Sequence, residues 1–280
     1  MKFTIFLCLF YFSSKLFGQN YQIGLHSNLY LSEQNSYSGY NEEQLLPDEV
    51  TYSNTKGNFG AGFSYGIEFN KFIIQNASIG IGLSNFKSFE LRLLNYDRNN
   101  LQQHVTAQMN QIRLNPKIGF FVPVKKFKFL TETGIILPFN TKTNYNFKES
   151  HTLNDSTRTF TEQYKYNFSF GFSQKIGFEV NLSKKVKLKS SLGFMLFSQT
   201  TKTRKTLSYE INATDQLQNL SLYESQTNYF PNLNGFSNNA DFNGSKISEK
   251  AKDDLFMTHR FSSFELNITL IYEIFKNTNN

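Results

Sequence analysis

The stretch that decides the fold is YNFSFGFSQKIGFEVNL, residues 166–182. Its even-numbered positions are apolar apart from Gln174, whereas its odd-numbered positions are all small or polar. An alternation with a period of two residues is typical of a β-strand that has one apolar and one polar face. We therefore predict a strand here, with these side chains on its apolar face: Tyr166, Phe168, Phe170, Phe172, Ile176, Phe178, Val180 and Leu182.

The same alternation recurs along the chain and predicts eight strands in all. The other seven cover residues 21–31, 59–69, 77–93, 112–122, 129–139, 186–198 and 264–274. These strands are longer than the roughly five or six residues of a usual soluble strand, and they reach the roughly 9–11 residues that cross a bilayer.

The connections between these strands alternate between short and long. Short links follow the second, fourth and sixth strands, and long polar links follow the others, at 33–58, 94–106, 140–165 and 199–258. Short turns at one end and long loops at the other are typical of outer-membrane barrels. We predict an all-β fold, an eight-stranded antiparallel up-and-down transmembrane β-barrel, with both termini in the periplasm and the long loops at the cell surface.

The N-terminus has the pattern of a cleavable signal peptide. Lys2 precedes an apolar run over residues 3–12, and Ser13, Ser14 and Gly18 supply small residues near a cleavage site. We predict a signal peptide at 1–18, cleavage near 18/19 and a barrel domain over 19–280. The apolar run is far shorter than the roughly 20 residues of a membrane-spanning helix.

Composition excludes several other classes of protein. The 31 Phe and 15 Tyr residues exclude a disordered chain, and the single cysteine excludes a disulfide framework. The formal net charge is +7, but Lys and Arg are dispersed and no recognition motif is present. We therefore expect no nucleic-acid partner.

Soluble sandwiches also alternate, and a secreted lipocalin-like barrel or sandwich is the alternative fold. The polar faces of the predicted strands are rich in Gly, Ser and Asn, which suits the narrow interior of an eight-stranded barrel. Together with the signal peptide, this composition favours the membrane barrel over the soluble alternative.

Charged residues of both signs lie on the predicted polar faces. The candidate lumen charge network consists of Glu68, Arg113, Lys117, Lys175, Glu179, Glu265 and Glu273, and Glu132, Lys187 and Lys189 share the same faces. An unpaired buried charge is very costly, so we expect these groups to pair internally and to plug the barrel. A structural role is favoured over a proton relay or substrate channel, and a small-solute pore is the weaker alternative.

Three stretches resemble the PorT-like outer-membrane β-barrel family of Bacteroidota-type bacteria. They are QIRLNPKIGFFV (111–122) with its mid-strand proline, the hairpin GFEVNLSKKVKLKSSLGF (177–194), and ELNITLIYEIF (265–275), which resembles a closing barrel strand. The last departs from that pattern, since Phe275 lies off the outward register and five polar residues follow it. The resemblance implies a Gram-negative outer-membrane location and a barrel, and its best-known member acts in protein secretion. It implies no single activity.

The sequence predicts no catalytic residue, no cofactor and no metal site. Of the four histidines, His26 points inward, His104 and His151 lie in predicted loops near Ser150, Asp155 and Ser156, and His259 adjoins Arg260. No nucleophile elbow or metalloprotease motif is present. A surface enzyme that acts on lipid or peptide, with the loop histidines, is the alternative to a non-enzymatic barrel.

These patterns predict a structural or interaction platform held in outer-membrane lipid. Loops 33–58 and 199–258 are long, polar and rich in aromatic residues, so we expect a protein partner to bind there. Such a barrel would be an accessory of a secretion or surface assembly. The pattern specifies no oligomeric state.

Overall fold

The computed structural model describes residues 21–32, 37–46, 49–56, 58–98, 100–153 and 155–275. The predicted signal peptide lies outside the described residues. Among the described residues, no helix has the length and apolar character needed to cross a membrane.

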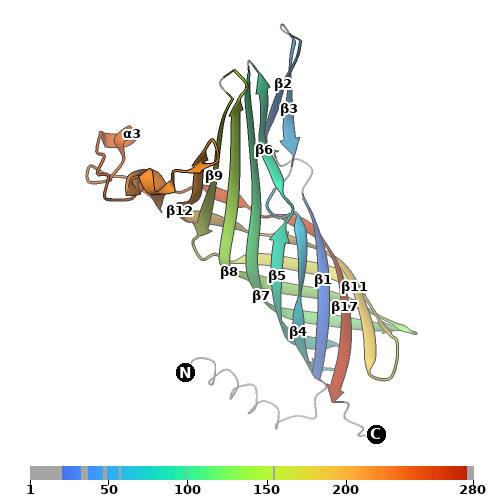
Figure 1. The fold of residues 1–280 in the computed structure, drawn as a ribbon. Helices are drawn as coiled ribbons and strands as arrows, with labels where there is room; N and C mark the ends of the chain where they lie inside the picture. The colour runs from blue at the N-terminus through green and yellow to red at the C-terminus, as the bar shows by residue number, and fades with distance from the viewer. Residues whose placement is uncertain are drawn as a thin grey trace.

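Eight strands form a closed ring in which every neighbour is antiparallel (Figure 1). In order around the ring they are β1 (Tyr21–Ser32), β4 (Gly62–Ile74), β5 (Ala77–Ser88), β7 (Leu101–Val124), β8 (Phe127–His151), β10 (Gly171–Asn181), β11 (Val186–Leu196) and β17 (Ser263–Phe275). β1 pairs with β17 and closes the ring, so the predicted eight-stranded up-and-down barrel is confirmed.

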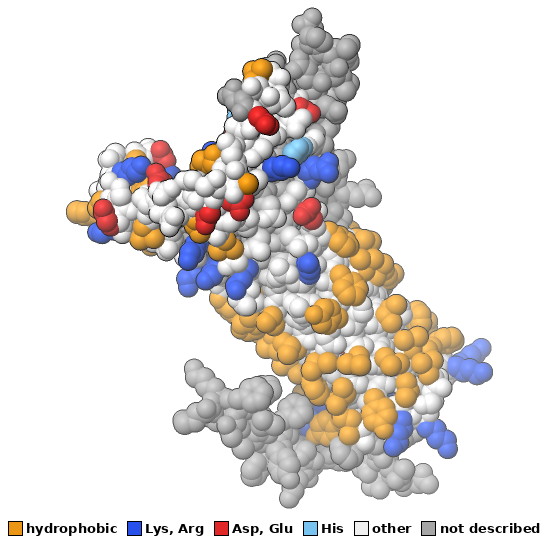
Figure 2. All heavy atoms as spheres, viewed as in Figure 1, with side chains coloured by type: hydrophobic (Ala, Val, Ile, Leu, Met, Phe, Trp, Pro, Cys, Tyr) orange, Lys and Arg blue, Asp and Glu red, His pale blue; other side chains and the backbone are white. Residues whose placement is uncertain are grey.

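The outer face of the ring is apolar and the inner face is polar. Along β17, Phe264, Leu266, Ile268 and Leu270 are exposed, whereas the residues between them are buried inside the barrel. Figure 2 shows the exposed apolar side chains as a band across the visible face of the barrel. A soluble sandwich or lipocalin-like barrel would bury this face, so the soluble alternative is wrong. The band is the lipid-facing surface of a transmembrane barrel.

Two aromatic residues lie inside although the alternations over 59–69 and 166–182 place them on the outward faces. Phe59 and Tyr166 are both buried, because each precedes the ring strand to which its alternation assigned it. After Tyr166 the chain leaves strand geometry over 167–170, and β10 begins at Gly171 with Phe172 exposed. The irregular segment changes the direction of the side chains, which a count of two along the sequence cannot detect.

At one end the ring strands are joined by tight connections, as predicted. At the other end β7 and β8 continue beyond the ring (Figure 1). Beyond the ring they form one sheet, here called the raised sheet, with five further strands. These are β9 (Ser156–Tyr166), β12 (Ser198–Ile211), β6 (Leu91–Arg98) and the hairpin of β2 (Tyr37–Leu46) and β3 (Glu49–Lys56). The segments expected as long loops therefore contain strands. Their sequences lack the apolar face of period two that the lipid-facing ring strands show.

The rest of the longest predicted loop forms a lobe, residues 212–257. It contains β13 (Thr214–Asp215), the 3-10 turn η1 (Leu217–Asn219), α2 (Leu222–Ser225), β14 (Gln226–Phe230), α3 (Ala240–Asn243) and β15 (Lys252–Leu255), and β16 (Thr258–Arg260) leads back to the barrel. β14 pairs with both β12 and β15, and this pairing attaches the lobe to the raised sheet (Figure 1).

Candidate functional site

The centre of the lumen holds a four-membered charge cluster supplied by four different strands. Lys117 Nζ on β7 lies 2.7 Å from Glu68 Oε2 on β4 and 3.1 Å from Glu132 Oε1 on β8. Lys189 Nζ on β11 lies 2.6 Å from Glu68 Oε1 and 3.1 Å from Glu132 Oε1. All four residues are buried. The cluster links strands across the barrel, and it is neutral as a whole.

Two further ion-pair groups lie on the same inner surface. Lys175 Nζ lies 2.5 Å from Glu265 Oε1. Nearer the tight-turn end, Lys187 Nζ contacts Glu179 Oε1 at 3.0 Å and Glu273 Oε1 at 2.5 Å, so two carboxylates share one ammonium group.

Glycines make room for these side chains in the narrow interior. A Cβ on Gly24 would lie 2.7 Å from Glu68 Cγ, and a Cβ on Gly193 would lie 2.8 Å from Lys175 Cγ. Gly193 is the register partner of both Lys175 and Glu265, which lie on the strands to either side of it. An eight-stranded barrel has little interior space, so the large charged residues need small neighbours.

Arg113 differs from the lumen lysines in its surroundings. Its Nε donates to Gln111 Oε1 at 2.6 Å, and its Cζ lies 3.6 Å from the ring centroid of Phe86. The rings of Tyr30 and Phe197 lie 5.0 and 5.5 Å from the same atom. Three aromatic faces therefore stabilise the guanidinium by cation–π contact. Among the described residues it forms no ion pair.

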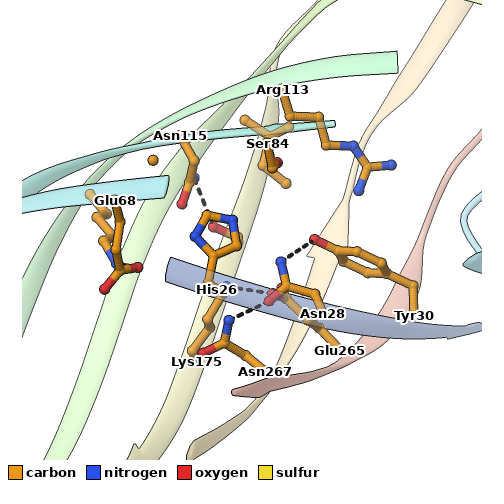
Figure 3. A pocket seen from close by; sticks show the side chains of 14 residues that line it. His26, Asn28, Tyr30, Glu68, Ser84, Arg113, Asn115, Lys175, Glu265 and Asn267 are labelled. Atoms are coloured by element: carbon orange, nitrogen blue, oxygen red, sulfur yellow. Dashed lines mark hydrogen bonds and ion pairs between the residues drawn. The ribbon is translucent and has the colours of Figure 1, made fainter. Parts of the chain in front are cut away.

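A small cavity of about 30 Å³ is lined by basic and acidic side chains, among them Arg113, His26, Lys175, Glu68 and Glu265 (Figure 3). The Asn28 side chain beside it donates to Ser64 Oγ at 3.0 Å and to the Tyr30 hydroxyl at 3.1 Å, and Asn267 donates to Asn28. A water needs roughly 10–15 Å³ of such space, so the cavity has room for about two waters and no larger solute.

Apolar side chains close the lumen on both sides of the charged layer. Phe72, Phe121 and Leu130 pack together at the tight-turn end. At the other end the buried cluster includes Tyr30, Phe86, Met109, Met195, Phe197 and Phe261. Ion pairs, hydrogen-bonded amides and aromatic rings therefore occupy successive levels of the interior, with the small cavity among them.

The sequence placed all seven candidate residues of the charge network on inward faces, and the structure brings six of them into ion pairs: Glu68, Lys117, Lys175, Glu179, Glu265 and Glu273. Arg113 is the exception. The sequence reasoning missed Phe86 and Phe197 as its neighbours. Within the predicted strand 21–31, Tyr30 alternates with Leu29 and Leu31 and so falls on the polar face. An aromatic residue at such a lumen position was the available signal.

The four histidines lie in separate surroundings. His26 lines the lumen cavity, His104 is exposed on β7, and His151 Nε2 lies 3.3 Å from Glu149 Oε1. His259 packs against the rings of Phe59 and Tyr166, where burial lowers the pKa of its imidazole. Within the described ranges, none of them hydrogen-bonds a serine, threonine or cysteine side chain. No group of three or more His, Cys, Asp or Glu residues there could hold a metal ion.

A closed eight-stranded ring with an apolar outer band and a charged, paired interior defines the class of protein. It is an outer-membrane β-barrel, since a closed barrel satisfies every backbone group in lipid and its alternating strands separate lipid-facing from lumen-facing side chains.

No protein-family model matches the sequence, and no curated protein sequence does. The similar solved structures include OprG of Pseudomonas aeruginosa, with 10% identity over 92% of this chain and 97% of that one and a TM-score of 0.45. A major outer membrane protein of Thermus thermophilus is 11% identical over 92% and 100%, with a TM-score of 0.40. Neisserial surface protein A is 8% identical over 92% and 98%, with a TM-score of 0.35. These similarities are distant. The assignment to the outer-membrane β-barrels therefore depends on the closed ring of strands, the apolar outer face and the charged, paired interior.

Proposed function

We propose that the protein is a non-conducting outer-membrane barrel that holds an interaction platform at the cell surface. The observation that carries this proposal is the filled lumen: the ion-pair layer around Glu68 and Lys189 lies between two packed apolar clusters. A barrel whose lumen is occupied by its own paired and packed side chains serves as an anchor rather than as a channel, and outer-membrane lipid is its first partner.

The raised sheet and the lobe are the part of the chain available to a protein partner. Phe236 is 100% exposed, and Phe242 and Phe230 are also exposed on the lobe. Aromatic residues among small polar ones are good contact anchors, because they supply a large contact area at little cost in side-chain entropy. We therefore assign partner binding to the lobe, within the region 199–258, together with the hairpin in 33–58.

The resemblance of three stretches of the sequence to the PorT-like family supports a role as an accessory of a secretion or surface assembly in a Gram-negative envelope. A surface enzyme that uses His104 or His151 is the alternative. It would need a nucleophile within hydrogen-bond reach of a base, and the only such contact of these two residues in the described ranges joins His151 to Glu149. We propose that the protein is not an enzyme.

Planar-bilayer recording tests the non-conducting part of this proposal. The purified, folded protein should give no stepwise current. The double substitution Phe72→Ser and Phe121→Ser, which opens the apolar cluster at the tight-turn end, should still give no current, since the central charge cluster remains in place. Regular current steps from the native protein would contradict an anchor and favour the small-solute pore.

Site-specific photo-crosslinking in the native host tests the platform. A benzoylphenylalanine at position 236 should give a discrete adduct, whereas the same probe at Leu153, an exposed apolar position outside the lobe, should not. Mass spectrometry of the adduct identifies the partner. Equal adducts at both positions, or none at 236 in a protein that is folded and surface-exposed, would argue against the lobe as the binding surface.

A further inference from the structure

Arg113 is a buried cation whose two terminal nitrogens lack a partner. Only 2% of its surface is exposed, and neither Nη1 nor Nη2 hydrogen-bonds any described residue. Each buried lysine of the lumen, by contrast, contacts one or two carboxylates. The aromatic rings around Arg113 offset only part of the cost of such a group, because buried charges need both pairing and hydrogen bonds.

The charges of the lumen balance in total but not locally. Around the cavity and the central cluster, four cations (Arg113, Lys117, Lys175 and Lys189) face three carboxylates (Glu68, Glu132 and Glu265). The remaining carboxylate is in the group at Lys187, where Glu179 and Glu273 share one ammonium. Glu273 lies eight positions beyond Glu265 on β17, roughly 26 Å at the usual rise of a strand. The region around Arg113 therefore carries one positive charge in excess.

The cavity beside Arg113 is suited to the missing negative charge. Its volume of about 30 Å³ fits a monatomic anion or about two waters. Arg113 and Lys175 line it together with Glu68 and Glu265, and each of these carboxylates is already paired with a lysine. His26 also lines it and leaves its Nδ1 without a partner (Figure 3). We propose that this cavity is a binding site for a small inorganic anion of the halide class, held by the terminal nitrogens of Arg113. The site is independent of the platform function.

Crystals grown or soaked in sodium bromide provide the direct test. Bromide should give an anomalous peak in the cavity within hydrogen-bond distance of an Arg113 terminal nitrogen. Density for water alone at that position, in bromide concentrations that label other surface sites, would overturn the proposal.

Unfolding in matched salts provides the second test. A ligand that binds only the folded state opposes unfolding, by roughly tenfold in the unfolding equilibrium at ten times its Kd. At constant ionic strength, chloride should therefore protect the detergent-folded protein, whereas gluconate, which is too large for the cavity, should not. Arg113→Gln should abolish this difference between the salts.

Lys187→Gln is the matched control, because it also removes a buried lumen cation but lies away from the cavity. It should lower stability and keep the difference between chloride and gluconate. Equal behaviour of the native protein in both salts, or a difference that survives Arg113→Gln, would refute the site. Should Arg113→Gln fail to fold, the bromide map of the native protein decides.

Discussion

Lys189 and Glu68 form a 2.6 Å ion pair inside the barrel although they are 121 positions apart in the chain. The pair connects β11 with β4, and these strands are not neighbours in the ring. Each partner also contacts one other member of the central cluster, so the four charges depend on one another.

Glu68→Gln should therefore destabilise the barrel strongly. Removing one partner of a buried pair leaves uncompensated charge, which costs about 3–5 kcal/mol, and here two lysines lose a carboxylate. The unfolding midpoint in denaturant, followed by the gel mobility of unboiled samples, measures the loss. Glu90→Gln, at an exposed position, is the control and should change little. Equal midpoints for both variants would mean that the central pairs contribute nothing to stability.

A second prediction concerns the apolar outer face of the barrel and tests it at Ile268. This residue is 60% exposed near the middle of β17, on the face that we assign to lipid. Ile268→Arg should cost about 2–4 kcal/mol in a bilayer, because a cation at the midplane loses its hydration. Unfolding from lipid vesicles measures this cost. Leu255→Arg on the lobe is also a substitution of an exposed apolar residue and should be nearly neutral. Equal effects would contradict the position of the band in lipid.

The ring could be predicted from sequence wherever lipid imposes the period of two, as it does along Phe63, Tyr65, Ile67 and Phe69 of β4. The raised strands could not, because no apolar solvent selects one of their faces. Residues 140–151 of β8, for example, continue the strand without such an alternation.

The candidate site was also predictable only in part: alternation shows which residues face the lumen but not which of them contact one another. Parity along a strand places Lys189 and Glu132 inside the barrel, but which carboxylate each lysine meets depends on the stagger of strands that the sequence does not specify. Alternation also places Phe197 inside, because it follows the outward-facing Leu196 at the end of β11. It does not show that the Phe197 ring meets Arg113, which lies on a different strand.

His259 predicts a pH dependence of stability at the raised end of the barrel. Its pKa is lowered by burial, and its Nε2 has no described partner. The unfolded chain therefore takes up a proton at higher pH than the folded protein does. This residue's contribution to stability should be complete above about pH 6.5 and should decline as the pH falls from there towards its lowered pKa.

His259→Phe should reduce the loss of unfolding free energy between pH 7.5 and 5, because the variant has no imidazole to protonate. His104→Gln, which removes an exposed histidine, should keep the native dependence. Denaturant midpoints at several pH values make the comparison. A native protein whose stability does not fall at all below pH 6.5, or a His259→Phe variant with the unaltered profile, would contradict the burial of a neutral imidazole.

The lobe depends on Asn238, whose side chain binds the backbone of the irregular segment 247–251. Its amide nitrogen donates to the carbonyl oxygens of Ile247, Lys250 and Ala251 at 3.0–3.1 Å, and its oxygen accepts from the Ile247 N–H at 2.7 Å. Asn238→Ala removes all four bonds and leaves backbone groups unpaired, at about 1 kcal/mol or more for each buried group. The lobe has no large apolar core to compensate.

We therefore expect Asn238→Ala to loosen the lobe and leave the barrel intact. Limited proteolysis should cut the variant between residues 212 and 257 at least several-fold faster than the native protein, while the heat-dependent shift in gel mobility stays the same. Asn243→Ala is a useful comparison, since Asn243 also donates to backbone carbonyls but is exposed, and it should have a smaller effect. A variant that resists protease as the native protein does would show that the pairing of β14 with β12 and β15 is enough to hold the lobe.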